Sequence, residues 1–414
     1  MTLWTPDWSL TINGSGEYAN LTLSNLTTTS GRTDIYTQAY AGYCNFQIIN
    51  LNQATISLDV NDQILLKVKN ESGVDVNVFG GYITDIDVEV VSSGTAGVNE
   101  VISVTALGAL SKLPKTLYTT SLAKDFDGDQ IYQVLSQALF SSWNEVPSAT
   151  TWATYDASTT WANAENSGLG EIDLPGNYEL ASRAANTTDV YSLATALANS
   201  GLGYLYEDAQ GRIGYADSTH RSQYLAANGY VELNANDALA AGIKTSKRSG
   251  DIRNTVNITY KNNQQTSASD LSSIALYGEQ AYNIETSLEN LADATAQANF
   301  YLTLRAFPEA QFRSITFPLH SPELSGTIRN ALLNVFMGMP VNLTNLPSNI
   351  NAGTFQGFVE GWTFTTTYNG LYLTLMLSPV SYSLQAFRWN DVPAVETWNS
   401  IIPTLEWLDA TIVA

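Results

Sequence analysis

The chain contains few of the residue types that usually carry catalysis. Its 414 residues include two histidines, His220 and His320, and one cysteine, Cys44. Each histidine stands beside Arg or Ser in an expected loop, without the HxxH or HExxH spacing of a zinc site, so we expect surface positions for both. A single cysteine allows neither an internal disulfide nor a cysteine-based zinc cluster, and its neighbours Tyr43 and Phe46 indicate a buried apolar position. These residues predict no catalytic, cofactor-binding or metal site.

Acidic residues are numerous, with 39 Asp and Glu against 18 Lys and Arg, a net charge of −21. That balance argues against a nucleic-acid grip built on phosphate neutralisation. A two-carboxylate hydrolase stays open, because the distance between carboxylates is invisible in a sequence, although no pair stands out. The motif Asp125, Asp127, Asp129 resembles the start of a calcium loop, but Gly128 and Ser136 do not match its sixth and twelfth positions. Helix capping by Asp129 is the favoured interpretation.

Six of the nine tryptophans form two matching sets, and each set begins with Trp-Asn, an acidic residue and Val-Pro. Within each set the tryptophans recur every nine residues, at Trp143, Trp152 and Trp161 and again at Trp389, Trp398 and Trp407. One interpretation is an aromatic surface that stacks on sugars or anchors a neighbouring protein. The favoured alternative is that short Trp-bearing segments pack back onto the rest of the molecule.

The strands that would position such residues also contain a repeat. The segment 78–86, with Phe79 followed by Gly80 and Gly81, is matched by 354–362, with Phe355 and Gly357, and the two phenylalanines are 276 positions apart (355 minus 79). The alternation of apolar and polar residues predicts a strand in each copy, and the internal glycine predicts a bulge or a close backbone approach. An apolar strand precedes each copy and a strand pair follows it, so we interpret the pattern as a duplicated β-domain.

Other segments predict helices and a hairpin between the two copies. Helical spacing covers 130–140, and Asp189 is expected to cap a second helix that ends at 199–201. The turn 208–211 predicts a β-hairpin. A longer helix over 287–305 is expected to begin at a capping box formed by 286–289 and to stop before Pro308.

The predicted fold class is mainly β (α+β), in four parts. They are a first β unit over 1–115, with 218–245 as a candidate addition; an inserted helix-plus-hairpin domain over 116–217; a second β unit over 246–384, with the helix 287–305; and a Trp-rich C-terminal segment over 385–414. The amino terminus lacks a basic region followed by an apolar run, so we expect synthesis in a host cytoplasm without a signal peptide.

Taken in order, these features resemble the tail hub, or minor tail, proteins of long-tailed bacteriophages, relatives of the baseplate hub proteins of contractile tails. The resemblance covers most of the chain, and the Trp-rich end is similar to that of many such proteins in phages of actinobacteria. The Trp set at 143–161 is a departure without a family role. The residues that carry the resemblance are 79–83, 107–110, 253–258, 277–279, 355–361 and 377–379.

The resemblance implies two tail-tube-like β-barrel domains and a structural protein of the virion tail tip, without enzymatic activity or cofactor. It implies a homotrimer that matches a six-fold tail tube to a three-fold tip, because each subunit brings two similar units. Expected partners are the distal tail or tail tube protein, the tape measure protein and other minor tail or receptor-binding proteins. DNA would pass through an acidic lumen without specific binding. The alternatives are a carbohydrate-binding tail protein that attaches to a host-surface glycan, and a tail-associated cell-wall hydrolase.

Overall fold

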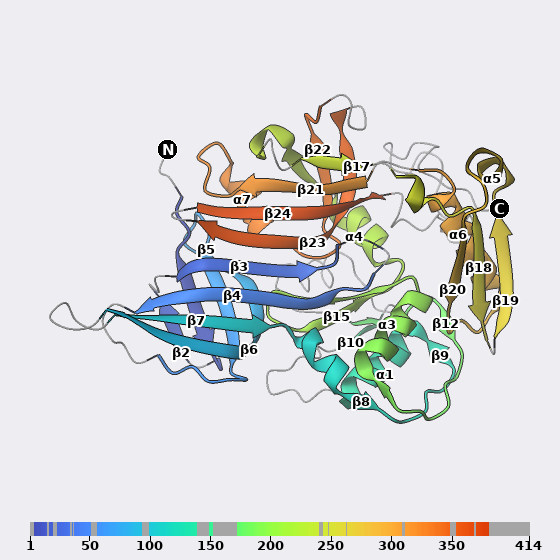
Figure 1. Ribbon diagram of the computed structural model, residues 1–414, viewed down its shortest axis with the longest axis horizontal. Helices are drawn as coiled ribbons and strands as arrows, with labels where there is room; N and C mark the ends of the chain where they lie inside the picture. The colour runs from blue at the N-terminus through green and yellow to red at the C-terminus, as the bar shows by residue number, and fades with distance from the viewer. Residues whose placement is uncertain are drawn as a thin grey trace.

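Strands dominate the computed structural model and form several sheets, as the alternating patterns predict (Figure 1). In the described part of the chain, no helix is both long and apolar enough to cross a membrane. The structure describes residues 4–14, 16–19, 23–33, 35, 37–50, 56–92, 99–138, 149–151, 172–239, 243–246, 248–261, 263–308, 311–347, 353–367 and 370–380.

The largest sheet contains 13 of the described strands and includes both copies of the repeat. Its path runs β17-β21-β24-β23-β3-β4-β7-β6-β5-β1-β2, and β22 and β16 branch from β23. The strands from the first copy are β1 Trp8–Ile12, β2 Gly16–Ala19, β3 Leu23–Gly31, β4 Tyr40–Asn50, β5 Gln63–Lys69, β6 Asp75–Ser92 and β7 Asn99–Leu107. Those from the second are β16 Val231–Asn234, β17 Lys244–Ser246, β21 Gln311–Pro318, β22 Pro340–Thr344, β23 Phe355–Thr367 and β24 Gly370–Pro379.

These strands form because alternate residues are apolar and bury one face of the sheet. In β5, Ile64, Leu66 and Val68 are buried while the residues between them are half-exposed. In β4, Cys44 and Phe46 are buried in the same way, which confirms the expectation for Cys44. Burial of each such aliphatic side chain stabilises the fold by about 1.5–3 kcal/mol.

The sequence repeat is confirmed as a repeat of strand order. β6 lies between β5 and β7, and β7 continues to β4 and β3. β23 likewise lies between β22 and β24, and β24 continues to β21 and β17. The two copies differ in the strand beyond, because β1 runs antiparallel to β5 whereas β16 runs parallel to β22.

The register repeats as well. Gly81 opposes Ile64 in the first copy and Gly357 opposes Val341 in the second. A bulge follows at the equivalent place, between Ile83 and Asp85 in β6 and between residues 359 and 361 in β23. The 276-residue offset of the sequence repeat therefore holds through the bulge.

The glycine of each copy allows a close backbone approach. A Cβ on Gly81 would lie 2.5 Å from the carbonyl oxygen of Leu107, and one on Gly357 would lie 2.3 Å from that of Ser378. The rings of Phe79 and Phe355 fill the other side, 2.9 and 2.5 Å from the same positions. No side chain fits there, which explains why both copies carry glycine.

The two copies are fused instead of closed. β23 pairs with β3, so the last strands of the second copy continue directly into the sheet of the first. Among the described strands the path ends at β17 and at β2 without meeting, and the expected closed barrels are not found within one chain. The physical reason is that the edge of β3, which could close the first copy on itself, is used to join the second.

Residues 109–237 supply most of the helices and the shorter strands. Asp189 caps α3 as predicted, accepting a hydrogen bond from Ser192 N at 2.8 Å, and the hairpin β14–β15 is confirmed. The capping role expected for Asp129 is wrong, because α1 already begins at Asp127. The elements are η1 Ala109–Lys115, β8 Leu117–Tyr118, β9 Asp125–Phe126, α1 Asp127–Ala138, β10 Ala149–Thr151, β11 Ile172–Leu174, β12 Glu179–Leu180, β13 Thr188–Asp189, α3 Val190–Ser200, β14 Tyr204–Glu207, β15 Ile213–Ala216, α4 His220–Asn228 and η4 Ala235–Asp237.

A separate three-stranded sheet, in the order β19-β18-β20, stands at one end of the molecule with α5 and α6 (Figure 1). Here α6 begins at Leu291 and not at the expected capping box, because Ser287 N donates to Ser200 Oγ and Glu289 N to the Glu179 carbonyl. The helix ends at Arg305, before Pro308, as predicted. The remaining elements are η6 Ser249–Asp251, β18 Thr255–Tyr260, β19 Gln264–Ser269, α5 Leu271–Tyr277, β20 Ala281–Glu285, α6 Leu291–Arg305 and α7 Gly326–Leu333.

Candidate assembly site

The junction of the two copies is a strand pair between β3 and β23. Gly31 opposes Gly361 and Thr27 opposes Thr365. The backbones lie so close that a Cβ on Gly31 would be 2.3 Å from the Glu360 carbonyl oxygen, and the φ of Gly31 is +86°. Only glycine adopts that conformation without strain. The end of β3 is therefore built to receive the bulge of β23.

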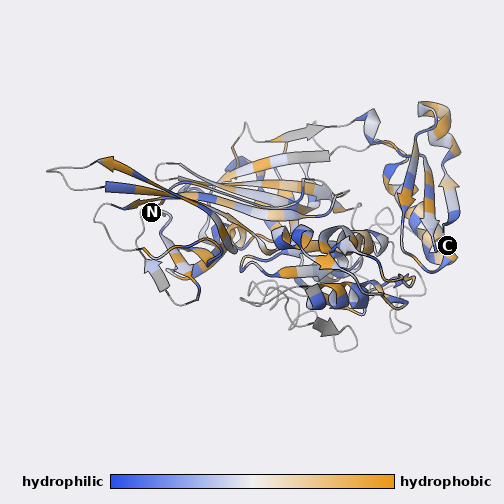
Figure 2. Cartoon of the chain, turned by 60° about the horizontal axis from the view of Figure 1, so that its bottom comes forward, coloured by the Kyte–Doolittle hydropathy of each residue, from blue (hydrophilic) through white to orange (hydrophobic). Residues whose placement is uncertain are grey.

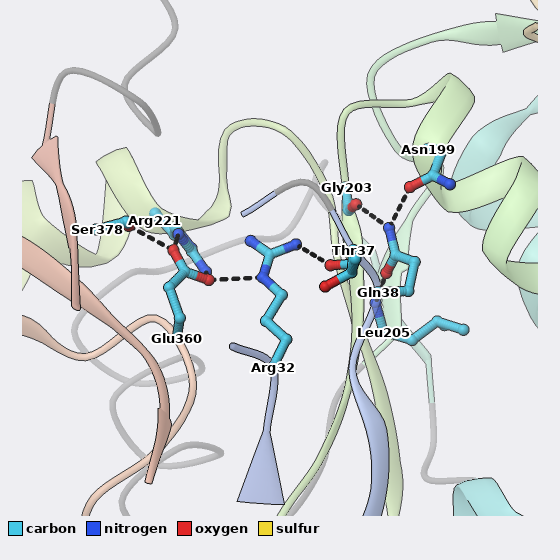
Figure 3. A network of polar contacts seen from close by, with 9 residues as sticks. All are labelled: Arg32, Thr37, Gln38, Asn199, Gly203, Leu205, Arg221, Glu360 and Ser378. Carbon is cyan, nitrogen blue, oxygen red and sulfur yellow. Dashed lines mark hydrogen bonds and ion pairs between the residues drawn. The ribbon is translucent and has the colours of Figure 1, made fainter. Parts of the chain in front are cut away.

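A buried ionic network holds this junction (Figure 3). The carboxylate of Glu360, at the bulge, accepts from Arg32 Nε at 2.6 Å and from Arg221 Nη1 and Nη2 at 2.7 and 2.9 Å. Ser378 Oγ on β24 donates to the same carboxylate. Burial alone raises the pKa of the Glu360 carboxyl, but the two guanidinium groups outweigh it and hold that pKa below its usual range. The network positions β3, α4 and the β23–β24 pair.

A second polar contact ties the same region of the first copy to α3 and β14 (Figure 3). Gln38 Nε2 donates to Asn199 Oδ1 at 2.7 Å and to the Gly203 carbonyl at 3.0 Å. Its Oε1 accepts from Leu205 N at 2.9 Å. Because each amide atom of Gln38 is hydrogen-bonded, the contact is structural and leaves no group for chemistry.

The first copy has the equivalent strand edge, which has no partner strand among the described residues. In β6 the residues that correspond to 361–365 are 85–89, and among the described strands they pair with β7 alone. The exposure differs accordingly: Val88 is 59% exposed, whereas its counterpart Phe364 is 1% exposed. Val90 and Val91 are also more than half exposed, and hydrophobic residues continue out along the projecting strands in Figure 2. An edge with exposed valines is a template for another strand.

The strand that would match this edge is β17. It occupies in the second copy the place that β3 occupies in the first, since Lys244 opposes Ser314 of β21 as Thr27 opposes Asn45 of β4. β17 ends the path of the sheet, so among the described strands its outer edge has no neighbour. Among the described strands, the chain therefore makes the β3–β23 contact once, and it also carries two further edges, on β6 and β17, that match the two sides of that contact but have no neighbour.

The six tryptophans singled out in the sequence, Trp143, Trp152, Trp161, Trp389, Trp398 and Trp407, lie outside the described residues. The surface position expected for His220 is wrong: its side chain is buried at the start of α4, with Nδ1 2.9 Å from Asp173 Oδ2. No local sequence pattern predicts the contact between His220 and Asp173, because the two residues are 47 positions apart. His320 is half-buried, with Nδ1 3.3 Å from the Leu371 carbonyl.

The acidic motif at 125–129 contributes one member to a buried carboxyl cluster. Asp127 accepts from the backbone N–H groups of Asn177 and Tyr178 at 2.8 Å each and from the Tyr215 hydroxyl. Burial, together with the nearby carboxylate of Asp217, raises the pKa of Asp127 to about 7. Within the described residues no group of three or more His, Cys, Asp or Glu is arranged to hold a metal ion. Asp127 thereby anchors the loop at 177–178, a role that the acidic pattern at 125–129 does not predict.

Asp217 and Asp173 complete that cluster. Asp217 Oδ1 accepts from the backbone and hydroxyl of Thr219 at 2.8 Å, and burial raises its pKa to about 7. Asp173 Oδ2 accepts from Asp217 N at 2.8 Å as well as contacting His220, and burial raises its pKa well above the ordinary value. Protonated carboxyls in such a site cost less to bury than charged ones.

The chain is similar to known proteins in its fold and not in its sequence. No family model matches the chain, and no curated protein matches its sequence. Among solved structures, the tail protein from Neisseria meningitidis MC58 is similar over 92% of this chain and 98% of its own, with a TM-score of 0.59 at 12% identity. The 43 kDa tail protein of prophage MuSo2 from Shewanella oneidensis is similar over 91% and 99%, with a TM-score of 0.56 at 11% identity. Over nearly its whole length, the chain has the fold of phage tail proteins.

Proposed function

We propose that this chain is a structural protein of a phage tail, and that three copies close into a ring of six similar β units at the tail tip. The observation that carries the proposal is a pair of strand edges that have no neighbour among the described strands, the β6 edge at 85–91 and the outer edge of β17. Both correspond in register to the contact that β23 and β3 make within the chain.

The geometry of repetition favours a closed ring. The β3–β23 contact passes from the first unit to the second within a chain, and a β17–β6 contact would pass from the second unit to the first unit of the next chain. A contact between two different surfaces repeats head to tail and closes when its rotation divides a full turn. Three copies with two units each would present six similar surfaces to a six-fold tube.

Charge supports the same pairing. The β6 edge carries Asp85, Asp87 and Glu89, whereas the sequence at β17 and just after it is basic, with Lys244, Lys247 and Arg248. In the proposed register, Lys244 would lie opposite Glu89, as Thr27 lies opposite Thr365. Opposite charges on facing strands favour one register over its neighbours.

In the tail, the chain would contact the distal tail or tail tube protein, the tape measure protein and other minor tail or receptor-binding proteins, and it would hold the receptor-binding apparatus for host attachment. Its two units would adopt the tube-like barrel arrangement only when neighbouring chains supply the missing strands. The net charge of −21 suits a lumen through which DNA passes without adhering. This role requires binding surfaces and no catalytic turnover.

The proposal is tested by mass and by cross-linking. Native mass spectrometry of the full chain should show a trimer, and Val88→Asp should shift it to monomer, because a charge would be placed in the apolar contact. Val60→Asp is the matched control, since Val60 is 57% exposed at a turn outside the β6 edge. A wild-type protein that stays monomeric at high micromolar concentration would overturn the proposal.

The register is tested separately with a disulfide. The sole native cysteine, Cys44, is buried, so a double variant Glu89→Cys with Lys244→Cys adds the only accessible thiols. Oxidation should produce covalent dimers and trimers and no larger ladder. Pairing Glu89→Cys with Ser269→Cys, on the separate small sheet, should produce neither; equal cross-linking in both pairs would contradict the register.

A further inference from the structure

A groove of about 590 Å³ lies between three segments that the assembly proposal does not use. They are the turn from β5 into the start of β6, the segment from the end of α4 to the start of β16, and the stretch from α7 to the start of β22. Its walls carry Tyr224, Tyr230 and Phe336, and the rings of Tyr224 and Phe336 pack edge to face with centroids 5.2 Å apart. The volume is in the range of small-molecule sites.

Asparagine side chains line the rest of the groove, and their hydrogen bonds fix their orientation. Asn70 Nδ2 donates to Asn330 Oδ1 at 3.0 Å, while Asn70 Oδ1 accepts from Ser72 N and Val74 N. Asn334 Nδ2 donates to the Asn330 carbonyl at 2.8 Å, and Asn228 Nδ2 donates to the Tyr224 carbonyl at 3.1 Å.

These bonds leave a defined set of groups for a ligand. Within the described part of the chain, Asn330 Nδ2, Asn334 Oδ1 and Asn228 Oδ1 make no hydrogen bond to another protein group. Each of these three amides is thus held by at least one hydrogen bond through its other atom, which leaves an amide donor and two amide acceptors without a protein partner. Preorganised polar groups cost little entropy on binding.

The charge of the groove excludes several ligand classes. Among the described lining residues Asp75 is the only charged one, and no Lys or Arg is among them. Phosphates, nucleic acids and acidic sugars would gain no counter-charge and would meet one like charge. A purely apolar ligand would displace the water that hydrogen-bonds to the three amides and would offer no hydrogen bonds in its place.

We propose that this groove binds a neutral saccharide. Sugar hydroxyls both donate and accept, which matches the mixed amide groups of Asn228, Asn330 and Asn334. The C–H faces of a sugar ring suit aromatic walls such as Tyr230 and Phe336. None of the described lining residues belongs to the β6 edge at 85–91, so the site adds a ligand to the molecule independently of the assembly proposal.

The test uses the full chain and defined probes. Isothermal titration calorimetry with maltotriose, lactose and the N-acetylglucosamine trisaccharide should detect binding of at least one, and 3′-sialyllactose should bind more weakly than lactose. Asn330→Ala and Asn334→Ala should each weaken that binding about tenfold or more. Asn283→Ala is the matched control, because Asn283 is an exposed amide on the separate small sheet.

Two outcomes would overturn the inference: none of the neutral probes binds, or binding survives in both groove variants. Loss of binding in Trp398→Ala with unchanged binding in Asn330→Ala would assign the sugar to the tryptophans instead. Thermal melting and native mass of every variant separate lost binding from lost folding. A protein that forms a trimer but binds no saccharide would contradict this inference without contradicting the assembly proposal.

Discussion

At the scale of single residues, the bulge position shows how the two copies have diverged. Glu360 occupies the bulge of β23, and the equivalent residue of β6 is Thr84, whose hydroxyl donates to the Thr105 carbonyl at 3.2 Å. A buried carboxylate needs complete pairing to offset the cost of removing it from water. Within the chain, Arg32 and Arg221 supply that pairing. The permanent junction carries the ionic network, and the open edge carries a neutral hydroxyl.

Replacement of Arg221 should be costly. Arg221→Ala removes two of the hydrogen bonds to the Glu360 carboxylate and leaves that buried charge incompletely paired. We expect the free energy of unfolding to fall by about 3–5 kcal/mol. Urea denaturation followed by tryptophan fluorescence measures it.

The matched control is Lys69→Ala, which breaks an ion pair of similar length, 2.8 Å to Asp7, in which both side chains are more than a third exposed. That change should cost about 1 kcal/mol or less. Equal losses in the two variants would show that burial of the Glu360 network contributes nothing to stability.

At the scale of elements, β6 and β23 are the two strands on which the fold is arranged. Each pairs along one edge with the following strand, and each carries its bulge at the same offset. The turns that precede β5 and β22 also match. Asn61 N donates to the Ile83 carbonyl and Gly338 N to the Val359 carbonyl, at 2.8 and 2.7 Å. Asn61 and Gly338 both have positive φ, the conformation that Asn and Gly tolerate best.

The close approach beside each strand predicts a clear mutational result. Gly357→Ala would place a Cβ 2.3 Å from the Ser378 carbonyl oxygen and 2.5 Å from the Phe355 ring. The backbones must separate, and we expect a loss of about 1–3 kcal/mol, with a similar loss for Gly81→Ala. Differential scanning calorimetry would record a lower Tm. Gly250→Ala, where nothing lies within 4 Å, should leave the Tm unchanged. An unchanged Tm for Gly357→Ala would contradict the close packing around Gly357.

At the scale of the whole molecule, acidic side chains in the interior make stability depend on pH, in addition to any effect of the surface charge. Burial raises the pKa of Asp127, Asp217 and Glu207 to about 7 in each case. Glu207 accepts from Gly42 N at 2.6 Å and from Leu110 N, so it ties the hairpin β14–β15 to the large sheet. These carboxyls connect separate parts of the chain while favouring their neutral form.

Stability should therefore fall as pH rises from 5.5 to 8.5. A carboxyl whose folded pKa lies above its unfolded value, 3.8 for Asp and 4.5 for Glu, contributes stability that is complete below the unfolded pKa and is lost as pH rises through about 7. The pKa of Glu360 is lowered instead, so its contribution is present throughout this window. Calorimetry at four pH values should show the Tm falling by several degrees.

Asp127→Asn separates this effect from general charge repulsion. The amide cannot ionise, so the Tm of the variant should depend less on pH across the same window, whatever its absolute stability. A control, Glu279→Gln, changes the net charge equally at an exposed site outside the β6 edge and should keep the wild-type slope. A wild-type Tm that rises with pH would show that the buried carboxyls are ionised without penalty.

Much of this molecule was determined by local sequence. The strands of the repeat, the α3 cap at Asp189 and the hairpin turn at 208–211 follow from residue periodicity and from side chains that bond their own neighbours. Residues 276 positions apart also occupy equivalent places in the strand pairing of β6 and β23. A shift by one residue would turn every buried side chain of either strand outward.

The tertiary structure alone decided the contacts between distant segments. The β3–β23 pair uses backbone N–H and C=O groups that every residue except proline possesses, so residue types do not indicate which edge will be joined. His220 is buried because Asp173 meets it, and α6 starts late because residues 287 and 289 donate their N–H groups to other segments. Sequence periodicity determines which face of a strand is buried, but long-range backbone pairing determines which strands become neighbours.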